Sequence, residues 1–535
     1  MGDPQYFYIT TPIYYVNDVP HLGHAYTTIA ADAMARFKRM RGFEVFFLTG
    51  TDEHGQKVAQ AAGRRGVSEQ QHCDELHENF KALWGRLGIT NDAFIRTTDP
   101  EHKAQVQGAL QQLWDGGFIY QQDYEGWYSV SDEMFVTDPS EIERLRESGK
   151  VEQVRESNYF FRMSSFQEPL VEAIESGRLR VCPQTRRNEI LGFLRGPLED
   201  LSISRPKSRL AWGVELPFDR EHVCYVWVDA LLNYCTALRY LNPHRVAGKC
   251  YEPFWPADYH LIGKDILTTH SVYWTTLLMA LELPLPRSIF AHGWWQFEGH
   301  KMSKSMGNVV DPNRLIDEFG VDSLRYFVLR QMPFGQDGDF GALALAERIN
   351  SDLANDLGNL ASRVLNLVAR DGDHFASEPQ TTPATSELLA VLEEVVSTFD
   401  RRFEEFSFST ALQEVWRVLG LTNKLIQETE PWRLCKERDE NPAAGTEYDA
   451  VMSTAGTVLR TVCALLFPIM PAKMQALWNA LGDDADLAAF RYQGTARVLA
   501  IPPAARITKI AALFPRIDLK SVRSFTERAE SEDLQ

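Results

Sequence analysis

The first fifty residues contain two apolar, strand-like runs separated by a helical run. Residues 6–15 (YFYITTPIYY) are largely aromatic or β-branched, so we predict a buried strand that ends at the turn residues Asn17 and Asp18. Residues 24–40 are mostly helix formers with a basic end, and Gly42 separates them from a second apolar run at residues 43–49. Strand, helix and strand in this order favour a parallel sheet.

Beyond Pro333 the pattern changes to long helical periods. One stripe of apolar residues recurs at spacings of four and three: Leu353, Leu357, Leu360, Val364 and Leu367. A second stripe consists of Leu412, Val415, Leu419 and Ile426. These stripes predict amphipathic helices, and we interpret this half of the chain as an α-helical bundle.

The stretch from about residue 117 to about residue 220 is less regular. It contains a charged, helix-like segment at residues 140–154 and a loop-like segment at residues 202–207, and strand-like residues return at 222–228. We interpret this stretch as an insertion that splits the sheet.

The composition is that of a globular protein with several domains: 535 residues, of which 44% are hydrophobic and 24% charged. The most apolar stretch, residues 461–472, contains two prolines and is shorter than the ~18 residues that suggest a membrane span. Residues 1–8 contain neither Lys nor Arg, unlike a secretory or transit signal. We therefore expect a soluble, cytoplasmic protein with no membrane partner.

Charge and cysteine content restrict the possible partners further. The formal net charge is -18, which argues against nonspecific binding of polyanions, so any nucleic acid must be recognised locally. The seven cysteines are never spaced as C-x-x-C. We expect reduced, mostly buried thiols and neither disulfides nor a zinc knuckle.

The run HLGH at residues 21–24 lies where the first predicted strand gives way to its helix. Unpaired backbone N–H groups and the helix dipole favour an anion there, and two imidazoles can donate to phosphate oxygens. Gly23 lacks a Cβ, so a flat ring can approach the backbone. The alternative is a pair of ordinary surface histidines.

The run KMSKS at residues 301–305, framed by Gly299 and Gly307, places two ammonium groups on a polar loop that could clamp a triphosphate. Such a pentamer alone is usually a solvated loop. In this order and at this separation, HLGH and KMSKS are the signature of class I aminoacyl-tRNA synthetases, which the chain therefore resembles.

Within that class, five further segments resemble the methionyl-tRNA synthetase family. They are PIYYVN at 12–17, TGTDEHG at 49–55, YVWVDA at 225–230, GKD at 263–265 and NLASR at 359–363. The resemblance extends from about residue 6 to residue 517. It implies that the carboxylate of L-methionine attacks the α-phosphorus of ATP, and that the methionyl group then passes from the adenylate to tRNA(Met).

The same resemblance assigns the phosphate chemistry. It implies that His21, His24, Lys301 and Lys304 are the catalytic residues and that ATP, with its Mg²⁺, also contacts Gly23, Gly263 and Asp265. Because the attacking carboxylate is already ionised, catalysis consists of positioning and of stabilising charge on the phosphates.

For methionine, the matching positions are Ile13, Tyr15, Asp52, Trp227, Ala230, Leu231, Tyr234 and His270. Asp52 would pair with the α-ammonium, and aromatic walls suit a thioether. Core packing is the commoner role of Trp and Tyr, and only the motifs favour the site. Leu231 and Thr269 depart from residues common in the family.

The resemblance also implies anticodon readers for CAU at Asn359, Arg363, Pro431 and Trp432. On a regular helix over residues 348–370, Asn355, Asn359 and Arg363 share a face away from the apolar stripe. Trp432 could stack on a base. The alternatives are a helix-bridging Asn359 and a buried Trp432.

Many family members carry a zinc knuckle in the insertion, but residues 127–133 contain no cysteine here, so we expect no metal. The insertion looks too small for an editing domain. Some bacterial members carry a further dimerisation domain, whereas this chain stops soon after residue 517, so we expect a monomer.

The expected architecture is α/β: a Rossmann-like class I synthetase catalytic domain with an inserted connective domain, followed by an all-α anticodon-binding bundle. The expected ranges are 1–116 and 221–298 for the catalytic halves, 117–220 for the insertion, 299–345 for the KMSKS loop and connector, 346–517 for the bundle and 518–535 for a polar tail. Two rival functions remain: a small nucleotidyltransferase with the same phosphate motif, and a catalytically silent, synthetase-like tRNA-binding protein.

Overall fold

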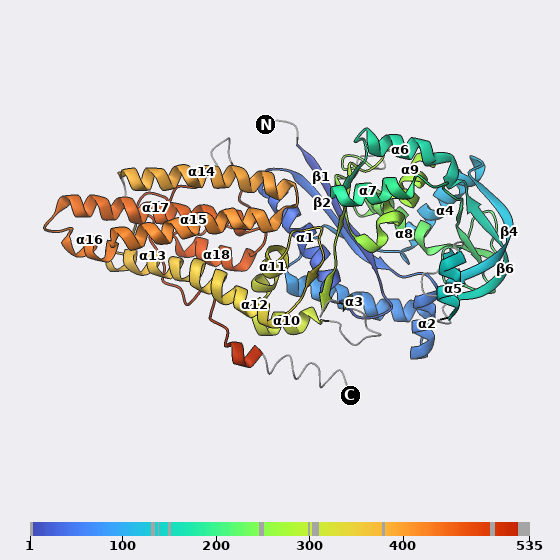
Figure 1. The fold of residues 1–535 in the computed structure, drawn as a ribbon, viewed down its shortest axis with the longest axis horizontal. Helices are drawn as coiled ribbons and strands as arrows, with labels where there is room; N and C mark the ends of the chain where they lie inside the picture. The colour runs from blue at the N-terminus through green and yellow to red at the C-terminus, as the bar shows by residue number, and fades with distance from the viewer. Residues whose placement is uncertain are drawn as a thin grey trace.

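A six-stranded parallel sheet forms the centre of one half of the molecule (Figure 1). The computed structural model describes residues 4–129, 134–136, 139–147, 151–244, 251–297, 300–301, 310–376, 380–492 and 498–522. The strand order is β3-β2-β1-β11-β12-β7. Their bounds are Ala93–Arg96, Glu44–Asp52, Tyr6–Tyr15, Tyr259–Gly263, Ser288–His292 and Arg180–Cys182. The predicted parallel sheet is confirmed, and its order reverses between β1 and β11, which opens a crevice at their carboxyl ends.

The sheet separates two hydrophobic cores, because successive side chains of a strand point to opposite faces. Phe7 and Phe47 belong to the core beneath α1 and α3, whereas Tyr8 and Phe46 belong to the core beneath α4 and α8. The bounds of the helices around the sheet are α1 Leu22–Met40, α2 Gln56–Arg65, α3 Glu69–Leu87, α4 Pro100–Asp115, α8 Val226–Tyr240, the 3₁₀-helix η2 Lys264–Ile266, the π-helix η3 Thr269–Trp274 and α9 Thr275–Ala280. Both faces are covered, so the strands are largely buried, and their charged residues lie at strand ends: Glu44, Asp52, Arg96 and Arg180.

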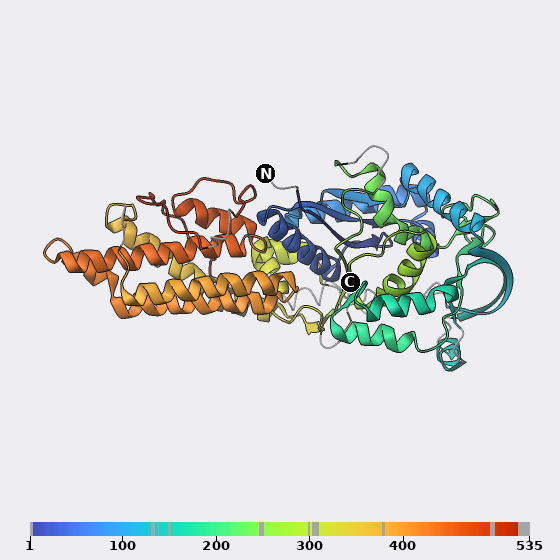
Figure 2. The same ribbon diagram turned by 90° about the horizontal axis from the view of Figure 1, so that it is seen from above.

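Residues 117–220 contribute to three sheets, one of which is the short pair of β9 with β10. Four strands form an antiparallel sheet in the order β5-β4-β6-β8, and β7 pairs with β12 in the central sheet. The bounds are β4 Ile119–Ser129, β5 Met134–Val136, α5 Pro139–Glu147, β6 Val151–Phe161, the 3₁₀-helix η1 Met163–Phe166, α6 Gln167–Glu175, α7 Gln184–Phe193, β8 Leu201–Ser202, β9 Ser204–Pro206 and β10 His222–Cys224. β4 and β6 lie at the opposite end of the molecule from α16 (Figures 1 and 2).

Three local predictions in this region are wrong. The helix expected over residues 140–154 ends at Glu147, because residues 151–154 pair with β4 as the start of β6. The expected strand 222–228 ends at Cys224, and α8 starts at Val226. A helix buried on several sides lacks a polar face, so its start looks like a strand in sequence. Residues 202–207 contain parts of β8 and β9 instead of a loop.

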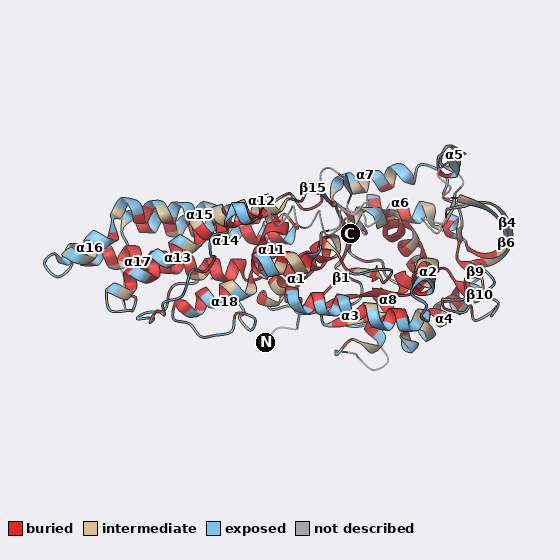
Figure 3. Cartoon of the chain, turned by 90° about the horizontal axis from the view of Figure 1, so that it is seen from below, coloured by how far each residue is buried: buried red, intermediate tan, exposed pale blue. Residues whose placement is uncertain are grey.

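The other half of the molecule is helical. Around the connector lie β13 Trp295–Phe297, β14 His300–Lys301, α10 Pro312–Phe319, α11 Val321–Arg330, β15 Gly338–Asp339 and α12 Ala342–Arg348. The bundle follows with the π-helix η5 Ile349–Gly358, α13 Asn359–Arg370, α14 Pro383–Glu404, α15 Phe408–Thr429, α16 Pro431–Glu437, α17 Pro442–Leu466 and α18 Pro471–Ala480. All residues of the two predicted apolar stripes are buried, which confirms the bundle (Figure 3).

One helix in the described part of the chain, α17, is long and apolar enough to span a membrane. Of its 18 most apolar consecutive residues, 89% are buried inside the protein, so it is the central helix of the bundle. The six cysteines that the structure describes are free thiols.

Candidate active site

A cavity of about 1320 Å³ lies at the carboxyl ends of β1, β2, β11 and β12. It brings together every residue expected at the methionine and ATP sites apart from the two lysines of KMSKS. These lining residues are Ile13, Tyr15, His21, Gly23, His24, Asp52, Trp227, Ala230, Leu231, Tyr234, Gly263, Asp265 and His270. Lys301 ends β14, and Lys304 lies outside the described residues.

His21 and His24 form a reciprocal cap at the N-terminus of α1. The backbone N–H of Gly23 donates to Nδ1 of His21 at 3.0 Å, and that of His21 donates to Nδ1 of His24 at 3.1 Å. The rings stack with centroids 3.8 Å apart. Because each Nδ1 accepts a hydrogen bond, the ring proton of each imidazole is on Nε2. The two rings are therefore fixed as Nε2–H donors beside the positive end of the α1 dipole.

Gly23 is required by this cap. A Cβ at Gly23 would lie 2.9 Å from Cε1 of His21, closer than real Cβ contacts allow. Any other residue would push the first imidazole away from the helix end, so the glycine of the motif has a steric function.

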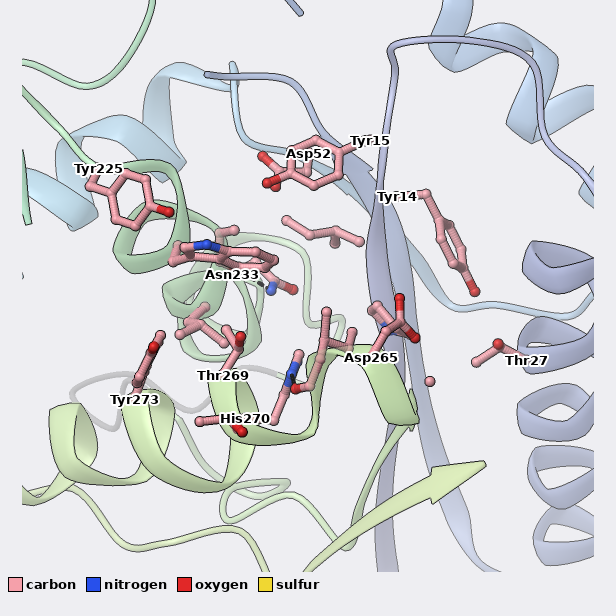
Figure 4. A pocket seen from close by; sticks show the side chains of 18 of the residues that line it. Tyr14, Tyr15, Thr27, Asp52, Tyr225, Asn233, Asp265, Thr269, His270 and Tyr273 are labelled. Atoms are coloured by element: carbon pink, nitrogen blue, oxygen red, sulfur yellow. Dashed lines mark hydrogen bonds between the residues drawn. The ribbon is translucent and has the colours of Figure 1, made fainter. Parts of the chain in front are cut away.

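The opposite side of the cavity carries aromatic side chains around a carboxylate (Figure 4). Asp52 ends β2 and is only 2% exposed. The rings of Tyr15 and Trp227 meet edge to face with centroids 6.2 Å apart. A buried carboxylate beside apolar and aromatic walls suits a ligand with a cationic end and an apolar end.

His270 lies on the π-helix η3 and is neutral. Its Nδ1–H donates to the carbonyl of Ile266 at 2.9 Å, and its Nε2 accepts the hydroxyl of Tyr234 at 2.7 Å. Burial lowers the pKa of His270 to about 4. The pair therefore presents an uncharged wall to the cavity, which suits an apolar side chain.

A third group of contacts lies where β12 leads toward KMSKS. His292 donates from Nδ1 to the carbonyl of Gly293 at 2.7 Å and accepts at Nε2 from the hydroxyl of Thr27 at 2.6 Å. The indole N–H of Trp294 donates to Asp265 at 3.1 Å. These bonds connect α1, β12 and the GKD segment on the side of the cavity from which the KMSKS loop departs.

Several lining residues were missed by the sequence analysis: Thr27, Arg205, Asn233, Tyr273 and His292. Thr27 and Asn233 follow His24 and Ala230 by three residues, a spacing that places them on the same face of an α-helix. Tyr273 follows His270 by the same interval, on the π-helix η3. That signal was available in the sequence. Arg205 comes from β9 in the insertion, and no local pattern connects it to the cavity.

The predicted anticodon residues lie in the helical half, far from this cavity (Figure 1). Asn359, Arg363 and Trp432 are exposed, whereas Pro431 is buried. The exposure of Trp432 contradicts the alternative of a core tryptophan. Asn355 is half-buried and accepts a hydrogen bond from Arg516. It lies on the π-helix η5, where the angle of 100° per residue used for its predicted face does not hold.

Two contacts join the segment that carries Arg363 to the segment that carries Trp432. The side chain of Asn423 bonds the carbonyl of Asp356, and Arg438 bonds Asp371; each pair is separated by 67 residues. The two segments therefore run side by side in the same direction.

Among the residues that the structure describes, no cluster of three or more His, Cys, Asp or Glu side chains is arranged to hold a metal ion. Residues 130–133, part of the segment expected to form a knuckle, are outside the described residues.

The family model "tRNA synthetases class I (M)" matches residues 7–145 and 143–365, and "Anticodon-binding domain of tRNA ligase" matches residues 386–507.

Two similar relatives are bacterial methionine–tRNA ligases. The one from Caldanaerobacter subterraneus subsp. tengcongensis is 43% identical and aligns over 98% of this chain and 81% of its own length. The one from Halalkalibacterium halodurans is 44% identical and aligns over 96% of this chain and 79% of its own length. A solved structure of Mycobacterium tuberculosis methionyl-tRNA synthetase in complex with methionyl-adenylate has a TM-score of 0.89 at 39% identity, and covers 96% of this chain and 100% of that chain.

Proposed function

The chain belongs to the methionyl-tRNA synthetase family of class I aminoacyl-tRNA synthetases, and we propose how its own residues carry out the reaction of that family. Family membership makes it an aminoacyl-tRNA ligase that activates methionine with ATP and transfers the methionyl group to tRNA. It also decides against the small nucleotidyltransferase, since an anticodon-binding domain is present.

Methionine binds between Asp52 and the aromatic wall. The carboxylate of Asp52 pairs with the α-ammonium, while Trp227, Tyr15, Tyr234 and the neutral His270 enclose the thioether. Ile13, Ala230 and Leu231 complete the apolar lining. The methionine carboxylate then faces the side of the cavity that holds the α1 N-terminus.

ATP, with its own Mg²⁺, binds beside methionine. The Nε2–H groups of His21 and His24 donate to phosphate oxygens, and the α1 N-terminus stabilises their charge. Gly263 and Asp265 line the nucleotide end. Lys301 and Lys304 add positive charge as the α-phosphorus is attacked and pyrophosphate leaves.

For tRNA, the CAU anticodon of tRNA(Met) is read at Asn359, Arg363 and Trp432, with the buried Pro431 starting the helix that presents Trp432. We further propose the domain ranges given above, with β7 at residues 180–182 assigned to the catalytic sheet, a monomer, a cytoplasmic location and no structural zinc. The acidic net charge supports local recognition of tRNA, since overall attraction is absent.

The observation that carries this assignment is that one cavity holds the reciprocal histidine cap on one side and the buried Asp52 with its aromatic wall on the other. The test is ATP–pyrophosphate exchange with each amino acid in turn. We expect exchange with methionine, a KM for methionine raised about tenfold or more by Asp52→Asn, and a lowered kcat in His24→Asn. Absence of methionine-dependent exchange would favour the catalytically silent protein instead.

A further inference from the structure

Asp229 is a buried carboxylate that no step of the proposed mechanism uses. It lies in the first turn of α8 and is 1% exposed. Its Oδ2 lies 2.5 Å from Nδ1 of His54, and its Oδ1 lies 2.8 Å from Nε2 of His102. Both histidines are also buried, so the three side chains form a closed polar network inside the protein.

The network is charged at its centre. Burial alone would raise the pKa of Asp229, but His54 and His102 more than offset this and lower its pKa to about 2. An ionised carboxylate only accepts hydrogen bonds, so His54 donates from Nδ1 and His102 donates from Nε2. The remaining nitrogen of His102, Nδ1, bonds the hydroxyl of Thr236 at 2.7 Å, which ties α4 to a later turn of α8.

Asp229 and His54 both lie next to residues proposed to bind methionine. Asp229 lies two residues after Trp227 and one before Ala230, the wall proposed for the thioether. His54 lies two residues after Asp52, the partner proposed for the ammonium. The bond between His54 and Asp229 therefore joins the two segments that hold opposite ends of methionine.

A second side chain of the segment that follows β2, that of Glu53, makes its own hydrogen bonds. The carboxylate of Glu53 accepts two hydrogen bonds from Arg96, at 2.7 and 2.9 Å, and one from Thr51 at 2.7 Å. This clamp attaches the segment to β3 but not to α8. Of the two side chains that follow Asp52, only His54 connects it to the helix that carries Trp227.

We infer that Asp229 and His54 are positioning residues that set the distance between the ammonium partner Asp52 and the thioether wall at Trp227 and Ala230. This inference rests on the proposed function of those three residues. Neither positioning residue touches the substrate; they act by fixing the separation of groups that do. Small misplacements of binding groups cost large factors in affinity.

The alternative is that the network only stabilises the fold. A stability role predicts lower melting temperature with an unchanged KM, whereas a positioning role predicts a change in the KM for methionine with the KM for ATP unchanged. A matched pair of variants separates them. Asparagine at position 54 places an amide N–H close to the position of Nδ1–H, whereas leucine has a similar size and no donor.

The experiment measures methionine-dependent ATP–pyrophosphate exchange and thermal unfolding for His54→Leu, His54→Asn, Asp52→Asn and Asp322→Asn. Asp322 is an equally buried aspartate on α11, remote from the methionine wall, and controls for loss of stability. We expect His54→Leu to raise the KM for methionine about tenfold or more, with kcat and the KM for ATP within about threefold. His54→Asn should restore the KM to within about threefold of the parent.

The outcomes separate failure of the positioning role from failure of the proposed methionine site. If Asp52→Asn raises the KM for methionine and His54→Leu does not, the positioning role is wrong and the proposed methionine site stands. If Asp52→Asn itself has no effect, the proposed site is wrong and the inference fails with it. If His54→Leu does not fold, His102→Leu and His102→Gln form a second pair on the other oxygen of Asp229, with the same expectation.

Discussion

Arg325 of α11 donates a hydrogen bond to Asp32 of α1 across the junction between the sheet and the helical bundle. Nη2 of Arg325 lies 2.6 Å from Oδ2 of Asp32, and both side chains are fully buried. The same guanidinium donates to the carbonyls of Pro468 at 2.9 Å, Ile469 at 2.7 Å and Leu87 at 3.1 Å. One side chain thus joins the turn between α17 and α18 to the helix that begins with the HLGH motif.

The first prediction concerns the stability of this junction. Arg325→Met should lower the free energy of unfolding by about 3–5 kcal/mol, because it removes the main counter-charge of the buried Asp32. Arg401→Met on the exposed surface of α14 is the control and should change it by less than about 0.5 kcal/mol. Denaturant unfolding of both variants provides the measurement. Equal free energies of unfolding for the two variants would show that the Arg325–Asp32 pair does not contribute to stability.

The second prediction concerns the KMSKS loop. Lys304→Ala should reduce the kcat of methionine-dependent pyrophosphate exchange by about 100-fold or more, since its charge acts on the phosphates in the transition state. Methionine binding, measured by calorimetry, should be nearly unchanged. Lys424→Ala, in the helical bundle, serves as the control. Exchange at the parent rate in the Lys304 variant would exclude this lysine from the chemistry.

The third prediction concerns the anticodon surface. Trp432→Ala and Arg363→Ala should each weaken aminoacylation of tRNA about tenfold or more, because a stacked base contributes about 1–3 kcal/mol, while pyrophosphate exchange stays near the parent value. Each variant should also lose part of its discrimination between a CAU anticodon and a mutated one. Trp114→Ala is the matched control, since Trp114 is 37% exposed and Trp432 is 40% exposed.

An unchanged discrimination ratio in both anticodon-surface variants, together with a lower melting temperature, would mean that these side chains only stabilise the bundle. Their exposure on α13 and α16 argues instead for contact with the anticodon, because exposed side chains contribute little to the packing of the bundle.

The fourth prediction concerns metal. The purified protein should contain no stoichiometric zinc, because residues 127–133 supply no cysteine and a structural site needs four ligands. Elemental analysis after dialysis checks this. One zinc per chain, released only on unfolding, would contradict it.

The fifth prediction concerns pH. Because burial lowers the pKa of His270 to about 4, the folded protein keeps this histidine neutral while the unfolded chain protonates it below about pH 6.5. The free energy of unfolding should therefore fall by about 3 kcal/mol from this group as pH decreases from about 6.5 to about 4, and no further below that. His270→Gln should lack this contribution. A constant stability difference between parent and variant from pH 7 to pH 4 would contradict the buried neutral state.

The sequence by itself determined on which local elements the candidate motifs lie. Strand-like residues 6–15, the HLGH run at a helix start and the apolar stripe from Leu353 to Leu367 depend on local periodicity and backbone preference, which act between residues close in the chain. The structure confirms these elements. The local patterns failed where tertiary packing overrides them: residues 151–154 become a strand because β4 pairs with them, and α8 starts within a strand-like run because it is buried on several sides.

Only the tertiary structure decided which distant residues meet. The bond between His54 and Asp229 spans 175 residues, and that between Arg325 and Asp32 spans 293. No pattern within a helix or strand encodes such contacts, because they depend on the order of strands in the sheet and on how the two halves pack. Arg205 illustrates the same limit: it reaches the cavity only because the insertion folds back over the sheet. Local physics therefore placed the motifs on their elements, and packing placed the elements around one cavity.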